Sequence, residues 1–442
     1  MAQHPRATTF QDRVAIMERA ALGQSDSEIA QALGCSVWTV RKWRRISQKH
    51  GRLGLTSTYG WPRSGPLGTL SPQLRHTILT LRQTHPGWGP DTMLAELRLD
   101  PCWHDQPLPS RSRIAALLKH AKLTRRYERQ SALPTSNLLP DGIPHDHWEL
   151  DAQGVMQVAG VGKVALISIV DVVSRMKVES YPCVDTTNPP LEAYQLMLRR
   201  AFLTTGLPRQ ISFDHGTVFF DNTSRSPFPT RLHLWLLALG VAVSFTRKRC
   251  PTDHAKIERT HQTMTLQTLL GQAWSDPTAL WAGLDARRAR LNQHIPSGVL
   301  GGRAPLDVYP TAAHSGRSYR PEWEVDMLDL HRVYQYLSTC RWFRRAKPNG
   351  VFAMGGYLYN VSTKFGGRAI EVRFDAERAV FVAQPEGWSD TLLIPPRGLT
   401  KETLMGELAD GATLPPYQLA LPFSHTSWRA LEYARGLAGT TS

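Results

Sequence analysis

The stretch Pro251-Thr-Asp-His-Ala-Lys-Ile-Glu-Arg-Thr-His261 places a glutamate, Glu258, among basic residues in a segment of helix-forming composition. Alone, such a glutamate is usually a solvated surface charge. Two upstream carboxylates change this interpretation, because Asp151 lies on a probable strand and Asp214 directly follows a second one. Carboxylates on a strand, at a strand end and on a helix predict a site for divalent metal ions.

Three carboxylates of this kind suit a particular chemistry. Mg²⁺ and Mn²⁺ prefer hard oxygen ligands. Two such ions, about 3.5–4 Å apart, activate the attacking oxygen and stabilise the leaving oxygen of a displacement at phosphorus. Without metal, clustered carboxylates repel one another and the pKa of at least one should rise. We therefore interpret Asp151, Asp214 and Glu258 as ligands of Mg²⁺ or Mn²⁺ rather than as a structural network.

Other acidic and histidine residues near these positions have alternative interpretations. Glu149 should point to the same face of its strand as Asp151. Asp171 follows a strand and is interpreted as a structural turn partner. His254 and His261 fall on the helix face of Glu258. A zinc site is a weak alternative there, because the spacing His-Glu-x-x-His is absent, and we expect DNA contact or packing instead.

Charge distribution indicates a polyanionic partner. The net charge is +15, and residues 1–130 hold 20 Lys and Arg against 9 Asp and Glu. Positive charge concentrated in this way favours DNA, because each neutralised phosphate releases condensed counterions. No apolar run of 18 residues and no signal-peptide segment occurs, so no membrane association is expected. The five cysteines form no Cys-x-x-Cys pair, which argues against a zinc site and a disulfide framework.

Residues 12–45 contain three short stretches with helical periodicity, the second of which begins with a capping box at Ser25. The spacing Ala30-x3-Gly34-x5-Val40 lets two helices approach closely around a glycine turn. It resembles the helix-turn-helix motif, whose recognition helix enters the major groove. An ordinary three-helix bundle with a basic face is the alternative. The residues expected to face DNA are Thr39, Arg41, Lys42, Arg44 and Arg45.

From residue 147 strand-length apolar runs replace helical periodicity, and three consecutive strands precede alternating helices and strands. This pattern predicts a mixed α/β sheet covered by helices. After residue 351 five short strands predict a small barrel. The expected order is a helix-turn-helix domain over 1–50, a linker over 51–70, a second helical DNA-binding or bridging unit over 71–130, a linker over 131–146, the α/β core over 147–275, a helical and loop connector over 276–347, the barrel over 348–396 and a tail over 397–442.

Residues 147–271 resemble the catalytic core of the DDE transposases and retroviral integrases. The matching stretches are Trp148-Glu-Leu-Asp151, Val170-Asp-Val-Val-Ser-Arg175, Phe213-Asp-His-Gly216 and Asp253-His-Ala-Lys-Ile-Glu-Arg259. The upstream helical units and His85-Pro-Gly-Trp-Gly-Pro90 are similar to bacterial insertion-sequence transposases of IS481 and IS3 type. The resemblance implies an RNase H-like fold, an SH3-like form for the barrel, and Asp151, Asp214 and Glu258 as the metal-binding triad.

The sequence also departs from these families. Between Asp214 and Glu258 lie 43 residues, more than is usual, and we assign the excess to a loop-like insert over 221–229. Where many relatives have Asn-Gly before the Lys-x-Glu sequence, this chain has His254-Ala255. The second departure concerns contacts of the loop rather than the metal site.

The resemblance implies a transposase that binds the ends of its element, frees a 3′-OH and joins it to target DNA with two Mg²⁺ or Mn²⁺ ions. Lys256 and Arg259 would position the phosphate backbone. The expected partners are double-stranded terminal-repeat and target DNA and further copies of the chain, in the bacterial cytoplasm with the nucleoid. An ATPase helper is left open. The alternatives are a DNA-binding regulator with an inactive core and a nuclease that only hydrolyses.

Overall fold

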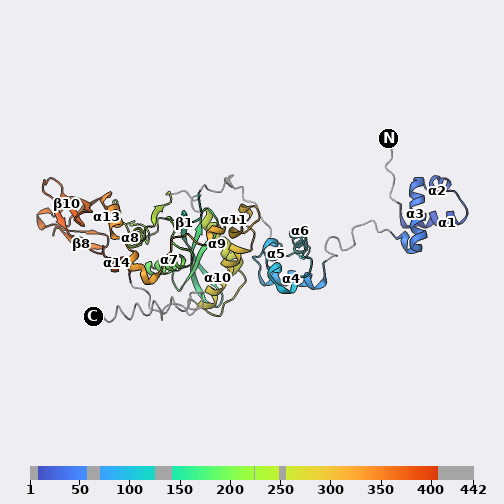
Figure 1. Cartoon of the computed structure of the whole chain (residues 1–442), viewed down its shortest axis with the longest axis horizontal. Helices are drawn as coiled ribbons and strands as arrows, with labels where there is room; N and C mark the ends of the chain where they lie inside the picture. The colour runs from blue at the N-terminus through green and yellow to red at the C-terminus, as the bar shows by residue number, and fades with distance from the viewer. Residues whose placement is uncertain (1–7, 57–69, 125–141, 223, 248–254, 407–442) are drawn as a thin grey trace. The chain divides into compact units, whose positions relative to one another are not determined.

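The computed structural model of the 442-residue chain describes residues 8–56, 70–124, 142–222, 224–247 and 255–406 (Figure 1). The chain divides into two compact units, the first comprising residues up to Thr77 together with Ser112–Lys122. The second comprises Ile78–Arg111 and the chain from Leu123 onward. Much of both predicted linkers and most of the predicted tail lie outside the described residues.

Three helices at the start of the chain share a core of their own. They are α1 (Phe10–Ala21), α2 (Asp26–Ala32) and α3 (Val37–His50). The predicted capping box is confirmed, because the Ser25 side chain accepts from the backbone N–H of Glu28 while the Glu28 carboxylate accepts from the backbone of Ser25. Gly34 turns the chain with φ of +62°, a left-handed conformation that glycine adopts without strain. The buried residues of this core are Ile16, Ile29, Ala30, Val40, Trp43 and Leu55.

Three further helices follow before the sheet. They are α4 (Pro72–Thr84), α5 (Pro90–Leu99) and α6 (Arg111–His120). The boundary between the two compact units passes through α4 and assigns α5 to the second unit. In that unit Glu96 of α5 accepts from Arg287, at 2.7 Å, and from Arg290, at 2.8 Å. The α5 helix is therefore held by ion pairs to the helix that carries both arginines.

A five-stranded mixed sheet forms the centre of the second unit. Its strands are β1 (His147–Val158), β2 (Gly162–Asp171), β3 (Lys177–Val184), β4 (Gln210–Phe213) and β5 (Ala242–Phe245). The strand order is β3-β2-β1-β4-β5. The first three strands pair antiparallel, whereas β4 pairs parallel with both β1 and β5. This is the strand order of the RNase H-like fold, which confirms the predicted fold of the core.

Helices cover both faces of this sheet (Figure 1). On one face, α7 (Leu191–Thr205) and α8 (Arg231–Ala238) bury their apolar residues against β1 and β4. On the other, α9 (Ala255–Met264) and α10 (Pro277–Gln293) pack against apolar residues of β1 and β2. The sequence predicts the Glu258 helix to continue to residue 270, but the α-helix ends at Met264 and a π-helical turn, Thr265–Leu269, follows.

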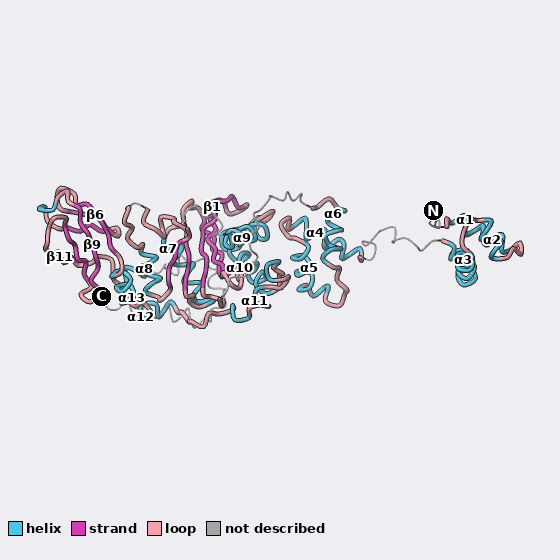
Figure 2. The backbone as a smooth tube through the Cα atoms, turned by 90° about the horizontal axis from the view of Figure 1, so that it is seen from above, coloured by secondary structure: helices cyan, strands magenta, loops and turns pink. Residues whose placement is uncertain are grey.

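The chain beyond α10 adds short helices and six strands. The helices are α11 (Pro305–Val308), α12 (Glu324–Met327), α13 (Leu330–Ser338) and α14 (Lys401–Met405). The strands are β6 (Arg341–Arg345), β7 (Val351–Met354), β8 (Tyr357–Asn360), β9 (Ala369–Asp375), β10 (Val380–Pro385) and β11 (Leu392–Ile394). They form a four-stranded sheet, β11-β10-β9-β6, and a separate β7-β8 hairpin (Figure 2). The five predicted strands are confirmed, β6 is additional, and the SH3-like barrel stays a prediction.

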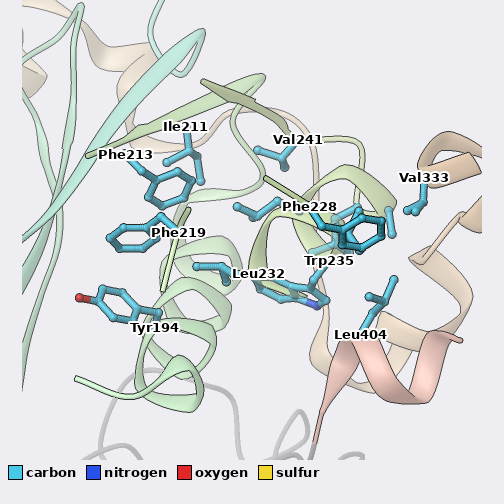
Figure 3. Close-up of a cluster of buried hydrophobic side chains, with 14 of the residues drawn as sticks. Tyr194, Ile211, Phe213, Phe219, Phe228, Leu232, Trp235, Val241, Val333 and Leu404 are labelled. Atoms are coloured by element: carbon cyan, nitrogen blue, oxygen red, sulfur yellow. The ribbon is translucent and has the colours of Figure 1, made fainter. Parts of the chain in front are cut away.

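The predicted insert joins this second sheet to the core. Trp342 of β6 donates from Nε1 to the carbonyl of Pro227 at 3.1 Å. The Phe228 ring lies 5.0 Å from that of Trp342 and belongs to one apolar cluster that runs from α7 and α8 to the second sheet (Figure 3). The cluster includes Trp235 on one side and Phe381 on the other. The insert is therefore a packing segment as well as a loop.

Two smaller expectations can be compared with the structure. No helix among the described residues is both long and apolar enough to cross a membrane. Four of the five cysteines fall within the described parts of the chain, and these four are free thiols. Cys250 lies outside those parts.

Candidate metal centre and DNA-contacting helix

The two predicted aspartates come from neighbouring parallel strands. In the β1–β4 ladder Glu149 is the partner of Ser212, and Asp151 and Asp214 each lie two residues further along. Side chains alternate between the faces of a strand, so Glu149 and Asp151 share the face opposite the buried Trp148. After β4 the chain turns sharply, and the N–H of Gly216 donates to Asp214 Oδ1 at 2.8 Å. The ladder thus places both carboxylates two residues beyond a paired position on adjacent strands, with Asp151 within β1 and Asp214 directly after β4.

Tyr194 of α7 provides a second indication that the two carboxylates lie close together. Burial is the main cause that raises the pKa of its hydroxyl, and the negative charges of Asp151 and Asp214 both raise it further. The ring packs edge-on against Phe219, 4.9 Å away, in the loop that follows Asp214 (Figure 3). One buried hydroxyl is therefore within electrostatic range of both aspartates.

The α9 helix crosses the sheet so that two of its side chains contact β1. Lys256 Nζ lies 3.0 Å from Glu149 Oε1, and His261 Nδ1 lies 3.8 Å from Asp151 Oδ2. The buried positions of the helix are Ile257, Thr260, His261 and Met264. Glu258 is exposed and stands between the two contacts, two residues after Lys256 and one turn before His261. The helix therefore carries Glu258 across β1, between its contacts with Glu149 and with Asp151.

The side chains present fit a hard divalent cation, although they are not drawn together. Among the described residues no three His, Cys, Asp or Glu side chains are close enough to hold one ion. Asp151 and Asp214 nevertheless supply carboxylate oxygens from adjacent strands, the donor type that Mg²⁺ and Mn²⁺ prefer. Glu258 is exposed, with no hydrogen bond or ion pair to another described residue.

The remaining residues predicted near this site have varied environments. Asp171 is buried and accepts from the N–H of Ser174 at 2.8 Å, which confirms its role as a turn partner. His261 is buried, and its roles in packing and in DNA contact both stay predictions. His254 lies outside the described residues. Of the two predicted phosphate contacts, Arg259 is exposed and donates to Gln262 Oε1 at 3.0 Å, whereas Lys256 is occupied by its ion pair.

The predicted DNA-facing residues of α3 are not equally available. Arg41 and Arg45 are exposed, but Arg41 Nε lies 3.3 Å from Asp26 Oδ2, and Arg44 pairs with the same carboxylate. The Thr39 hydroxyl lies 2.8 Å from that of Ser36, at the N-cap of the helix. Arg45 is thus the predicted cation that projects from α3 with neither an aspartate nor an aromatic ring beside it in the described contacts.

Sequence reasoning missed Trp38, which has 70% of its surface exposed on the same helix. The ammonium of Lys42 lies 5.5 Å from its ring centroid. Positions 38, 42, 45 and 49 recur at helical spacing, so a tryptophan and three basic residues share one face. A large aromatic residue outside the apolar periodicity of its helix was the signal that could have identified it.

Comparison with known proteins supports the assignment of the three-helix domain at the start of the chain. A family model described as a homeodomain-like domain matches residues 7–56. Residues 7–56 form a homeodomain-like domain. The chain therefore joins a helix-turn-helix domain to a core of RNase H-like fold.

Two solved structures of retroviral proteins resemble the chain. One is the HTLV-2 integrase catalytic core domain in complex with magnesium, in a trimeric form, at 16% identity and a TM-score of 0.27, covering 38% of this chain and 97% of that one. The other is the simian T-cell lymphotropic virus intasome in complex with PP2A regulatory subunit B56 gamma, at 13% identity and a TM-score of 0.30, covering 70% and 96%. Likeness at this level carries no argument, and the fold assignment rests on the strand order.

Proposed function

We propose that the chain is a DNA transposase or integrase that cleaves the ends of its element and transfers the resulting 3′ ends into target DNA. The observation that carries this proposal is the position of Asp151 within β1 and of Asp214 directly after the adjacent strand β4 in an RNase H-like sheet, with Glu258 on the helix that crosses β1. A homeodomain-like domain in the same chain supports DNA as the substrate.

Each part of the chain has a role in this proposal. The exposed face of α3, with Trp38 and Arg45, enters the major groove and selects the element ends. Asp151, Asp214 and Glu258 hold divalent metal ions. Bound metal supplies an activated water or 3′-hydroxyl oxygen and stabilises the leaving oxygen at phosphorus. Arg259 is exposed on the same helix as Glu258 and is placed to contact the phosphate backbone.

The two rival functions are a DNA-binding regulator with an inactive core and a nuclease that only hydrolyses. One assay distinguishes them from a transposase, because each predicts different products. The full-length chain would be incubated with donor DNA that flanks its gene and with a target plasmid, in Mg²⁺ or in EDTA. Wild type, Asp214→Asn and Glu258→Gln would be compared with Glu192→Gln. Glu192 is a suitable control because it forms an exposed ion pair with Arg231, at 2.7 Å, on the face of the sheet opposite α9.

We expect joined donor–target products in Mg²⁺ with wild type and the control. Both site variants should lose more than about 100-fold of this activity, since even outer-shell partners of a metal typically contribute 10–100-fold. Cleavage without joined products would support the nuclease. Binding without cleavage by wild type would support the regulator and reject the proposal. Joined products in equal amount from Asp214→Asn would reject Asp214 as part of the site.

A further inference from the structure

His261 is a buried imidazole placed directly against the Asp151 carboxylate. Only 5% of the residue is exposed, and Nδ1 lies 3.8 Å from Asp151 Oδ2. A hydrogen bond between the imidazole ring and the Asp151 backbone provides a second contact. At 3.8 Å the imidazole and the carboxylate are in contact, and the Asp151 side chain is 26% exposed. Asp151 is thus contacted from the α9 side by one ring.

The ring of His261 is incompletely satisfied. Its Nε2 is buried without a hydrogen-bond partner among the described residues. A buried unpartnered nitrogen costs stability that an apolar residue of similar size would not. Packing alone therefore does not explain a histidine at this position.

We infer that His261 is a positioning residue for Asp151, with the proton on Nδ1 donated to Asp151 so that the carboxylate is held toward Asp214. The inference rests on the proposed function, in which Asp151 is a metal ligand. Outer-shell donors of this kind fix the orientation of carboxylate ligands and raise metal affinity. Lys256 acts on Glu149 in a similar way, so β1 is held at two alternate positions by α9.

Isosteric substitutions separate positioning from packing. An asparagine side chain places its amide nitrogen near the position of Nδ1, whereas a glutamine places it near the position of Nε2. His261→Asn should therefore keep the donor toward Asp151, and His261→Gln should lose it, although both are polar. His261→Leu removes both nitrogens while filling the buried space. A residue needed only for packing would tolerate leucine best.

Mn²⁺ binding to the full-length chain tests this directly, by the EPR signal of free Mn²⁺ during titration, with and without donor DNA. We expect the Kd to rise about 10–100-fold in the Gln and Leu variants and less than about 3-fold in His261→Asn. Far-UV circular dichroism would verify that each variant is folded. If the leucine variant does not fold, the comparison of Mn²⁺ affinity between His261→Asn and His261→Gln tests the inference alone.

The outcomes also distinguish failure of this inference from failure of the proposed function, in which Asp151 is a metal ligand. If Asp151→Asn abolishes Mn²⁺ binding while the Asn, Gln and Leu variants at His261 all match wild type, the inference is overturned and the metal site stands. Equal loss in the Asn and Gln variants would also overturn it, because the donor position would then be irrelevant. If wild type and Asp151→Asn do not differ, the proposed metal site and this inference both fail.

Discussion

Trp88 Nε1 donates a hydrogen bond of 2.9 Å to the backbone carbonyl of Gln267, 179 residues further along the chain. Gln267 lies in the π-helical turn that follows the Glu258 helix. The Arg287 guanidinium stacks 4.3 Å from the Trp88 ring centroid, and a Cβ atom on Gly87 would come within 1.6 Å of the Leu266 carbonyl oxygen. The segment His85–Pro90 therefore anchors the start of α5 beside the end of α9.

Replacing Trp88 should destabilise the second unit. Trp88 is 8% exposed, and Trp88→Ala removes its buried ring, its hydrogen bond to Gln267 and its stacking with Arg287. We expect the free energy of unfolding to fall by about 3 kcal/mol. Urea unfolding followed by far-UV circular dichroism would measure it. Trp323→Ala is the matched control, because Trp323 is 58% exposed and its loss should cost less than about 0.5 kcal/mol. Equal effects would argue against the anchor.

A buried ion pair joins α7 to α12 and should be sensitive to loss of one charge. Glu324 is fully buried and accepts from Arg199 Nε at 2.7 Å and from Trp235 Nε1 at 2.7 Å. Glu324→Gln leaves the Arg199 charge without its carboxylate, which typically costs about 3–5 kcal/mol. The exposed pair of Glu192 and Arg231 provides the control, since Glu192→Gln should change stability by less than about 1 kcal/mol. The urea midpoints of Glu324→Gln and Glu192→Gln, each compared with wild type, would measure both changes in stability.

His233 should make the protein acid-sensitive. Burial lowers its pKa from 6.5 to about 4 in the folded chain. Because the folded pKa is the lower one, the unfolded chain binds the proton first, and the stabilisation present above pH 6.5 is lost as the pH falls toward 4. The loss approaches roughly 3 kcal/mol.

The variant His233→Phe tests this dependence, since phenylalanine can pack against Phe245 and Tyr336 as the histidine ring does. The difference in unfolding free energy between wild type and variant should shift against wild type between about pH 7 and pH 4.5. His261, whose pKa is also lowered by burial, is present in both proteins and cancels. A constant difference across this window would contradict the assignment to His233.

Arg45 and Trp38 should affect DNA binding in different ways. If Arg45 contacts a phosphate, Arg45→Ala lowers the slope of log affinity against log salt by about 1 and weakens binding to all sequences alike. Trp38→Ala removes an exposed apolar ring and should weaken binding with the slope unchanged. Fluorescence anisotropy at several salt concentrations measures both. Arg19→Ala on α1 is the control, because Arg19 donates to Gln24 and lies outside α3.

Local signals allowed much of the fold to be predicted. Capping at Ser25 located one helix, and the apolar run of β2 located a strand inside the sheet. The β6 strand was missed because arginines alternate with Trp342, so that the segment reads as a basic cluster although Trp342 is buried. Its strand character depends on pairing with β9, which lies further along the chain.

The candidate site was also predictable only in part, because local sequence suggests its residues but tertiary packing determines their contacts. Motif spacing predicted Asp151, Asp214 and Glu258 as site residues, and the strand ladder places the two aspartates on or directly after adjacent strands. The contacts of Lys256 with Glu149 and of His261 with Asp151 could not be read from spacing, because they depend on the angle at which α9 crosses the sheet. That angle is set by tertiary packing in the apolar cluster that includes Met264.

The self-contained core of α1, α2 and α3 contrasts with the ion pairs that hold α5 to α10. Recombination after Leu55 would exchange the homeodomain-like module with its own buried core intact. Recombination between α5 and the sheet would instead leave Arg287 without Glu96. New target specificities should thus arise in this lineage by replacement of whole first modules, whereas α5 and the RNase H-like core should be inherited together.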